Sequence, residues 1–358
     1  MIHKDVSKPL IYDLELNQLE AIFEEWGEAK YRARQVWQGL YQNLWTLPEE
    51  FSPLPQPFRQ KLAETFRFSG LSPVDYVESK DGETRKTLFK LPSGFAIEAV
   101  LMRYAKRRTL CISSQAGCAM GCVFCATGQM GFKKNLTSGE IVEQVLYYAR
   151  QLKEIGDVVT NVVVMGMGEP FHNYDATMSA INRLNDPKGY NFGARRFTIS
   201  TVGLIPAIQR FTQEKSQINL AISLHAADDE LRSTLLPINQ KYTLNELIKA
   251  CLEYVEITHR RLTFEWALIQ DVNDSVEQAE KLARLLRGFH RGGATLCHVN
   301  VIPLNPTHRY KGKATTHQQA LAFQQELEKH GIPCTIRIRR GIDIQAGCGQ
   351  LATQAVQT

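Results

Sequence analysis

Apolar positions in the first 70 residues repeat at helical spacing. Over residues 14–26 the apolar side chains fall three or four positions apart, and Gly27 follows as a natural helix end. The same spacing runs over 31–45, and a short helix follows the turn-rich residues 48–57. The pattern predicts a small helical domain over residues 1–72. Its second helix begins with basic residues (Lys30, Arg32, Arg34).

From residue 73 the pattern changes to short runs typical of strands. Asp81-Gly82 and Ser93-Gly94 are hairpin signals that separate the runs 74–80, 84–91 and 96–104. A further strand is expected over 107–115. Residues 73–110 are therefore predicted to form a short β meander that leads into the next domain.

Beyond residue 110, strand-like and helix-like segments alternate. Strands are expected at 109–114, 161–167, 196–201, 218–226, 262–269, 298–304 and 334–339, and helices near 138–153, 173–186, 204–213, 243–257, 275–289 and 315–330. Alternation of this kind requires parallel strands joined by right-handed crossovers, as in an α/β barrel or an open doubly wound sheet. Unusual polar residues follow the strands, where barrels hold their active sites. That favours a partial TIM-like barrel over residues 111–342, with a mobile tail at 343–358.

Composition and charge narrow the class of protein. The chain is 44% hydrophobic and 22% charged, as folded globular proteins are. No apolar run approaches the ~20 residues that span a bilayer, and the first residues include acids and no apolar segment. We therefore expect no leader, no membrane contact and a cytoplasmic location. Between Met102 and Lys134 there are six basic residues and no acid, which suits a polyanion, although a solvated loop would look the same.

Eight cysteines without an export signal indicate metal or redox chemistry rather than a disulfide scaffold. Three of them lie in apolar segments and are expected to be buried (Cys251, Cys297, Cys334). Cys348 stands between two glycines near the C-terminus, where a mobile backbone could carry its thiol to a site elsewhere.

The most specific motif is GCAMGCVFCATG, which spaces Cys118, Cys122 and Cys125 as C-x-x-x-C-x-x-C. Three thiolates on a short Gly-rich loop can hold three corners of a 4Fe–4S cluster, whose full ligand set is four cysteines. The open iron could chelate the amino and carboxylate groups of S-adenosylmethionine (SAM), and reduction would then yield a 5′-deoxyadenosyl radical. The alternative is a zinc site with Cys111 as fourth ligand, but a second C-x-x-C knuckle is missing.

The loop and the residues that follow the strands resemble the radical SAM superfamily. In particular, GCAMGCVFCATGQMGFKKNLTSGEIVEQV, VVVMGMGEP, LAISLHA and IDIQAGCGQLA resemble the RlmN/Cfr family of RNA adenine methyltransferases, over about residues 14–352. The resemblance implies a partial (βα)6 radical SAM barrel, one 4Fe–4S cluster on the three cysteines, and SAM. It implies that SAM is contacted by Gly168, Glu169, Ser200, Ser223, Leu224, His225 and Asn305.

The residues themselves leave the SAM site open. A carboxylate in GMGEP suits the ammonium of SAM and glycine admits a ligand, but a plain strand-to-helix turn would have the same sequence. His225 alone would more often be a hydrogen-bonded residue at a strand end.

The resemblance also implies a reaction with two SAM molecules. Carbon 2 of adenine is electron-poor and does not attack SAM directly, so Cys348 first becomes S-methylcysteine, whose methyl group is then activated and adds to the ring. Glu98 is implied as the proton acceptor, and Cys111 as the thiol that forms a transient disulfide with Cys348 and frees the product. By pattern alone Glu98 could instead be an outward-facing strand residue.

The implied substrates are adenine 2503 of 23S rRNA and adenine 37 of tRNA. Phosphate contacts are expected from the basic stretch, the helical domain and Arg337, Arg339 and Arg340, although Arg337 and Arg339 could line the barrel instead. The alternatives are Cfr-type methylation of carbon 8 of the same rRNA adenine and a metal-stabilised RNA-binding module. An electron donor such as flavodoxin or ferredoxin is expected, and the protein is expected to act as a monomer.

Overall fold

The structure, a computed structural model, describes residues 8–353. Two segments lie outside the described residues. They are residues 1–7, where no leader is expected, and residues 354–358, the end of the expected tail.

The helical domain consists of α1 (Leu16–Glu25), α2 (Tyr31–Gln38) and α3 (Gln56–Thr65), with short 3-10 turns at Ile11–Asp13 and Pro48–Glu50. The helix predicted over 31–45 ends earlier as an α-helix and continues as a π turn at Gly39–Asn43. Gly39 lies so close to the Phe51 and Trp45 rings that a β-carbon there would overlap them. The wider turn and the missing side chain let these aromatic rings pack inside the domain.

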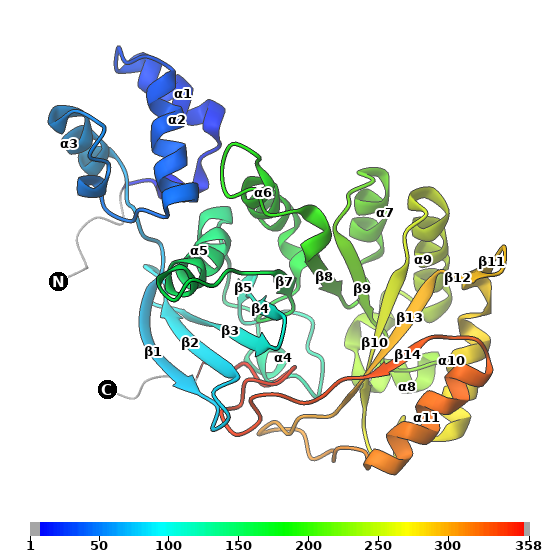
Figure 1. The fold of residues 1–358 in the computed structure, drawn as a ribbon. Coiled ribbons are helices and arrows are strands. Elements are labelled where there is room, and N and C mark those ends of the chain that lie inside the picture. The colour runs from blue at the N-terminus through cyan, green and yellow to red at the C-terminus, as the bar shows by residue number, and fades with distance from the viewer. Residues whose placement is uncertain (1–7, 354–358) are drawn as a thin grey trace.

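One ten-stranded sheet runs through the rest of the molecule (Figure 1). The antiparallel strands are β1 (Ser72–Glu78), β2 (Thr84–Lys90), β3 (Ala96–Tyr104) and β4 (Arg107–Cys111). The parallel strands that follow are β7 (Asn161–Val164), β8 (Phe197–Thr201), β9 (Asn219–Ser223), β10 (Leu262–Leu268), β13 (Cys297–Pro303) and β14 (Cys334–Ile336). Because β4 pairs with both β3 and β7, the meander is continuous with the barrel sheet. The order begins at β1 and ends at β14, which fits a partial, open barrel.

Helices cross between successive parallel strands, as the alternating pattern predicted. They are α5 (Ser138–Glu154), α6 (Tyr174–Asn185), α7 (Ile205–Gln213), α9 (Leu244–Thr258), α10 (Val276–Leu285) and α11 (His317–Lys329). Several begin at side-chain caps, for example at Thr137 and Thr243 in capping boxes. Cys251, Cys297 and Cys334 are buried in the core, as expected.

Two short helices were not predicted. They are α4 (Ala126–Met130), directly after the cysteine loop, and α8 (Asp229–Leu235), directly after β9. Both are too short for a periodic apolar face to appear in the sequence. Both lie at the strand ends that carry the polar motifs.

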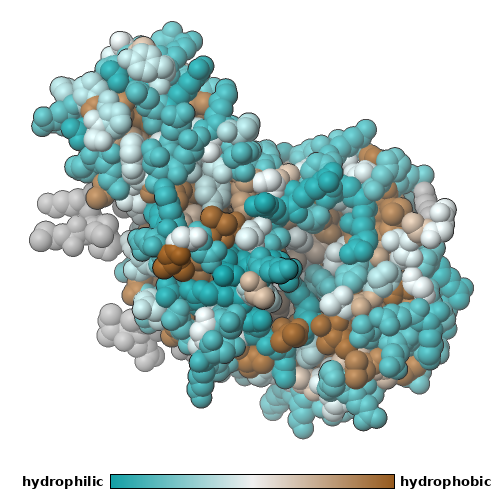
Figure 2. Space-filling view, in the orientation of Figure 1, coloured by the Kyte–Doolittle hydropathy of each residue, from teal (hydrophilic) through white to brown (hydrophobic). Residues whose placement is uncertain are grey.

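The surface facing the viewer in Figure 2 is mainly hydrophilic, and its apolar residues form small separate groups. Within residues 8–353, the helices lack the length and apolarity needed to cross a bilayer.

Candidate active site

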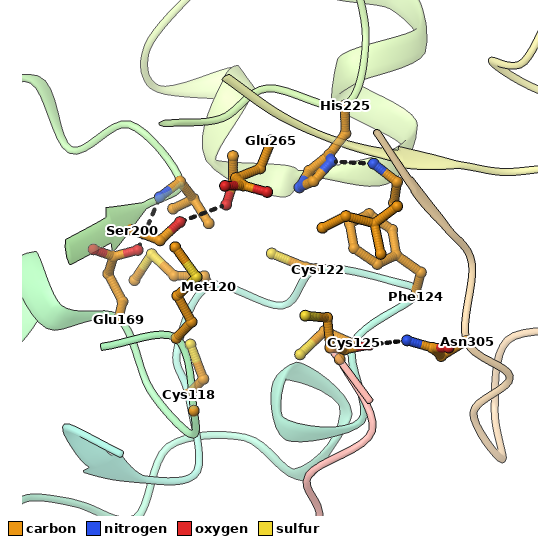
Figure 3. Close-up of a pocket in the computed structure, with 18 of the residues that line it drawn as sticks. Cys118, Met120, Cys122, Phe124, Cys125, Glu169, Ser200, His225, Glu265 and Asn305 are labelled. Atoms are coloured by element: carbon orange, nitrogen blue, oxygen red, sulfur yellow. Dashed lines mark hydrogen bonds between the residues drawn. The ribbon is translucent and has the colours of Figure 1, made fainter. Parts of the chain in front are cut away.

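One pocket gathers most of the polar and reactive residues that the sequence singled out (Figure 3). It lies at the carboxyl ends of the parallel strands, as expected for a barrel enzyme. Its lining includes Cys118, Cys122, Cys125, Gly168, Glu169, Ser200, Ser223, His225, Asn305 and Cys348.

The three cysteines of the loop stand between β5 (Gln115–Ala116) and α4. Cys118 and Cys122 are buried and Cys125 is partly exposed. Burial raises the pKa of Cys118 to about 12 and that of Cys122 well above its ordinary value. Free thiolates are therefore unfavourable here, and a bound cationic group would be needed to stabilise them.

The three thiols of the loop line one pocket together, and Figure 3 shows them around its space. Within residues 8–353, no three histidine, cysteine, aspartate or glutamate side chains are placed to hold a single metal ion. Behind the thiols, the buried Arg232 guanidinium donates to the carbonyls of Leu224 and Val202, and its positive charge faces Cys122. The donor set suits an iron–sulfur cluster held by thiolates.

Glu169 is held with its carboxylate in the pocket. Its side chain accepts hydrogen bonds from the N–H groups of Phe171 and Val202, both at 2.9 Å, and is 2% exposed. Burial raises its pKa to about 7. A bound ammonium group would offset that burial. Gly168 has φ +101°, and a β-carbon there would lie 2.5 Å from the Gln115 side chain. Glycine is thus required here because the backbone packs against Gln115. The sequence had suggested a different reason, namely that glycine lets a ligand approach the backbone.

Ser200 is the second-last residue of β8 and Ser223 ends the neighbouring β9, and their hydroxyl oxygens lie 3.2 Å apart in the pocket. His225 is hydrogen-bonded, as its sequence position alone suggested, and it also lines the pocket. Its Nδ1 accepts from the Ala267 N–H at 2.9 Å, so Nε2 carries the proton. Burial lowers the pKa of His225 to about 3, which keeps the ring neutral. Its φ of +61° is unusual for a histidine and is consistent with a functional constraint.

Leu224 is the predicted SAM residue that this pocket does not include. Its side chain is fully buried, while its N–H donates to the Glu265 carbonyl and its own carbonyl accepts from Arg232. The Leu224 side chain is therefore not placed to contact a ligand in this pocket.

Two buried polar atoms without a hydrogen-bond partner among the described residues line this pocket, Asn305 Oδ1 and Glu265 Oε2. Asn305 was predicted, and Glu265 was not. Glu265 is 5% exposed, and its other oxygen accepts from the Asn300 amide at 3.0 Å. Asn305 Oδ1 is therefore expected to find its partner on a ligand, whereas Glu265 Oε2 already forms an ion pair with Arg337 at 3.8 Å. In the sequence, Glu265 is marked by being an acid inside the apolar strand LTFEWALI.

A second cavity adjoins the first and is lined by the two cysteines with proposed roles outside the cluster. Cys111, at the end of β4, and Cys348, on the tail, both line it, and both are free thiols. Burial raises the pKa of Cys111 to about 12. Desolvation by the surrounding protein raises the pKa of Cys348, and the Arg337 guanidinium opposes that rise. The residue is nevertheless exposed at the surface of the cavity. Arg337 thus lines the barrel, which is the alternative left open for it.

The tail is docked across the strand ends. The Ala126 N–H donates to the Gly349 carbonyl at 2.7 Å, and the Asn305 amide donates to the Cys348 carbonyl at 3.1 Å. These bonds hold Cys348 between the cluster loop and β13.

Glu98 lies apart from both cavities. Its side chain is buried rather than outward-facing, with 5% exposed. It lines a separate hollow between the meander and the tail. Its carboxylate accepts from the Ala352 N–H at 3.0 Å and pairs with Lys86 at 3.2 Å. Glu98 therefore lines a different hollow from the one that Cys111 and Cys348 share.

Comparisons with known proteins agree over nearly the whole chain. The radical SAM superfamily matches residues 112–286, and the ribosomal RNA large subunit methyltransferase N-terminal domain matches residues 11–67. A probable dual-specificity RNA methyltransferase RlmN of Chloroflexus aurantiacus is 47% identical over 98% of this chain and 94% of its own length. The dual-specificity RNA methyltransferase RlmN 1 of Myxococcus xanthus is 47% identical over 95% of this chain and 93% of its own.

A solved structure has the same fold. The radical SAM methyltransferase from Sphaerobacter thermophilus superposes with a TM-score of 0.92 at 50% identity, over 96% of this chain and 99% of that one. A match at this level covers the helical domain, the meander and the barrel together.

Proposed function

Because this chain belongs to the RlmN family of RNA methyltransferases in the radical SAM superfamily, we propose that it methylates carbon 2 of an adenine in 23S rRNA and in tRNA. The observation that carries this proposal is the joining of two cavities at Cys348. One holds the cluster cysteines and SAM residues, and the other holds Cys111. The target adenines are those at position 2503 of the rRNA and position 37 of tRNA.

The enzyme uses one 4Fe–4S cluster and SAM, as its superfamily does. Cys118, Cys122 and Cys125 would hold the cluster, and Glu169, Ser200, Ser223, His225 and Asn305 line the space for SAM. When bound, the cluster supplies the electron that cleaves SAM. A flavodoxin or ferredoxin would deliver that electron from outside the chain.

Cys348 is the methyl acceptor in this proposal. Its thiolate attacks the methyl carbon of one SAM, so a sulfur–carbon bond forms and the sulfonium bond breaks with release of S-adenosylhomocysteine. Arg337 favours the thiolate because its positive charge lowers the pKa of Cys348. The open position of this thiol at the junction of the cavities supports the assignment.

Glu98 and Cys111 complete the reaction. The methyl group on Cys348 first loses one hydrogen atom to the 5′-deoxyadenosyl radical, and its carbon then bonds to the adenine, so the adduct carries one unpaired electron. Glu98 takes the proton from the ring carbon, and the adduct gives up one electron to a one-electron acceptor, a role that the cluster would supply when bound. The Cys111 thiolate then attacks the Cys348 sulfur, the disulfide forms, and the sulfur–carbon bond breaks, leaving its electron pair with the new methyl carbon, which takes up a proton. Since Ala352 covers Glu98, the base meets the adduct only when this tail contact opens.

The runner-up, methylation of carbon 8, is not favoured because the relatives compared above carry the RlmN name. Action as a monomer in the cytoplasm belongs to the same proposal. On the face shown in Figure 2, the apolar residues form small, separate groups, and this supports only the monomer part of the proposal.

The two-SAM scheme predicts a defined product ratio. With RNA, SAM and a reductant, each methylated adenine should be accompanied by one S-adenosylhomocysteine and one 5′-deoxyadenosine. Chromatography of the small molecules, together with mass spectrometry of digested RNA, measures all three. Methylated RNA with S-adenosylhomocysteine as its sole SAM product would contradict the proposal.

RNA binding is expected at the turn between β3 and β4. Lys106 and Arg107 are exposed there, whereas Arg108 is already paired with Asp157. Replacing both exposed residues with alanine should weaken RNA binding and lower the magnitude of its logarithmic salt slope by up to about two, since each neutralised phosphate contributes roughly 0.9.

The measurement is a salt titration of RNA affinity. A matched control replaces Lys281 and Arg284 with alanine, two exposed basic residues on α10. An equal loss in both double variants would show that the β3–β4 turn is not the RNA contact.

A further inference from the structure

Lys86 is a charged residue in the middle of β2 whose side chain is almost fully covered, with 13% exposed. Its ammonium group lies 3.2 Å from Glu98 Oε1. It also donates to the backbone carbonyl of Gln345 at 3.3 Å. One cation thus joins the carboxylate of Glu98 to the tail segment that carries Cys348.

The register of the sheet produces this contact. Leu88 pairs with Glu98 and Lys86 pairs with Val100 across the antiparallel β2–β3 ladder. Residues two apart on a strand share a face, so Lys86 and Glu98 are diagonal neighbours within reach of a long side chain. The pair therefore follows from the meander itself and does not depend on how the tail lies.

Glu98 is held from the tail as well. Its second oxygen accepts from the Ala352 N–H at 3.0 Å. The N–H of Lys80, in the β1–β2 turn, donates to Asp343 at 2.9 Å and anchors the start of the tail. The meander therefore holds the tail on both sides of Cys348, and the Lys86–Glu98 pair is the charged part of that contact.

The electrostatic balance around Glu98 depends on Lys86. Burial raises the pKa of Glu98, and Lys86 is the larger of the two influences that oppose the rise, ahead of the Ala352 N–H. The other ionisable groups that line this hollow are Asp75 of β1, Tyr76 of β1 and Asp343 of the tail. The carboxylates of Asp75 and Asp343 carry the same charge as ionised Glu98 and therefore do not stabilise it. Lys86 is therefore the cation lining this hollow that can keep Glu98 ionised.

We propose that Lys86 is a positioning residue for RNA methylation, which keeps Glu98 as a carboxylate and fastens the Cys348 tail against it. This inference rests on the proposed function, in which Glu98 accepts the proton of the adenine ring carbon. The electron pair of the broken carbon–hydrogen bond stays in the adduct. Protonated Glu98 attracts Lys86 less and no longer offers Ala352 an anionic acceptor, so the opened tail contact re-forms less readily at the stage when Cys111 must reach the Cys348 sulfur.

The test compares Lys86→Met with Lys86→Arg, which keeps the charge, and with Lys90→Met on the same strand, where the lysine is exposed. Loss of the cation raises the pKa of Glu98, so the acid limb of the methylation rate should move up by about one pH unit. At a pH below that limb the rate should fall about tenfold. Lys86→Arg should restore the limb, and Lys90→Met should match the wild type.

A second readout needs no turnover. Amide hydrogen exchange in the tail peptide 345–352 should be several-fold faster in Lys86→Met than in the wild type, the arginine variant or Lys90→Met. A wild-type pH profile and unchanged exchange in Lys86→Met would overturn the inference. If instead Glu98→Gln methylates RNA at the wild-type rate, the assignment of the proton acceptor in the proposed function fails. The exchange result separates that failure from a failure of the Lys86 contact.

Discussion

Replacement of Cys348 with alanine should abolish RNA methylation while the cluster remains in place. The variant lacks the sulfur that accepts the first methyl group, and the cluster cysteines belong to a different segment of the chain. Replacement of Cys111 with alanine should act later. Cys348 still takes the methyl group and still bonds to the adenine, but without the partner thiol in the shared cavity the adduct cannot be released.

A denaturing gel distinguishes the two variants. Cys111→Ala should give a shifted, nuclease-sensitive protein–RNA band, and Cys348→Ala should give none. Cys334→Ala is a matched control, because this buried core thiol lies outside both cavities. If Cys111→Ala cleaves SAM at the wild-type rate yet forms no adduct, its resolving role is wrong, and Cys111 is a packed strand residue.

Replacing any one of Cys118, Cys122 or Cys125 with alanine should remove the brown chromophore and SAM cleavage together. Anaerobically purified wild-type protein should contain about four irons per chain. The two remaining thiols of a variant cannot hold the cluster, and their burial disfavours the thiolate form without it.

Metal and sulfide analysis measures the effect, and Cys111→Ala is the control that should keep its irons. A chain that contains one zinc and no sulfide would contradict the cluster assignment. Full activity of the triple variant would also contradict it.

The fold was predictable where periodicity is strong. The radical SAM barrel, its crossover helices and the meander appear as alternation and helical spacing, and the family and structural matches confirm them. Elements shorter than two turns were missed, as at α4 and α8, because a stretch of five to seven residues shows no periodic face. The π turn after α2 was missed because the apolar spacing over 31–45 continues through it, and the close packing of Gly39 against the Phe51 ring is a tertiary contact.

Residues of the candidate site were predictable where a motif carries them, as for the cysteines and GMGEP. Glu265, Arg232 and Lys86 escaped because their roles come from tertiary neighbours. Arg232 lies in the polar helix α8, and Lys86 follows another basic residue on β2, so neither pattern distinguishes a buried cation from a solvated one. The contact of Glu98 with the tail could not be anticipated either, because it depends on Ala352, which lies more than 250 positions away in the chain.

The central claim is that this chain methylates carbon 2 of adenine in two RNAs. Mass spectrometry of nucleosides from cells that lack the gene, with and without the gene restored, tests it most directly. We predict that 2-methyladenosine is absent from 23S rRNA and tRNA of the deleted strain and returns in both with the wild-type gene, but not with Cys348→Ala. Restored 8-methyladenosine, or 2-methyladenosine unaffected by the deletion, would contradict the account.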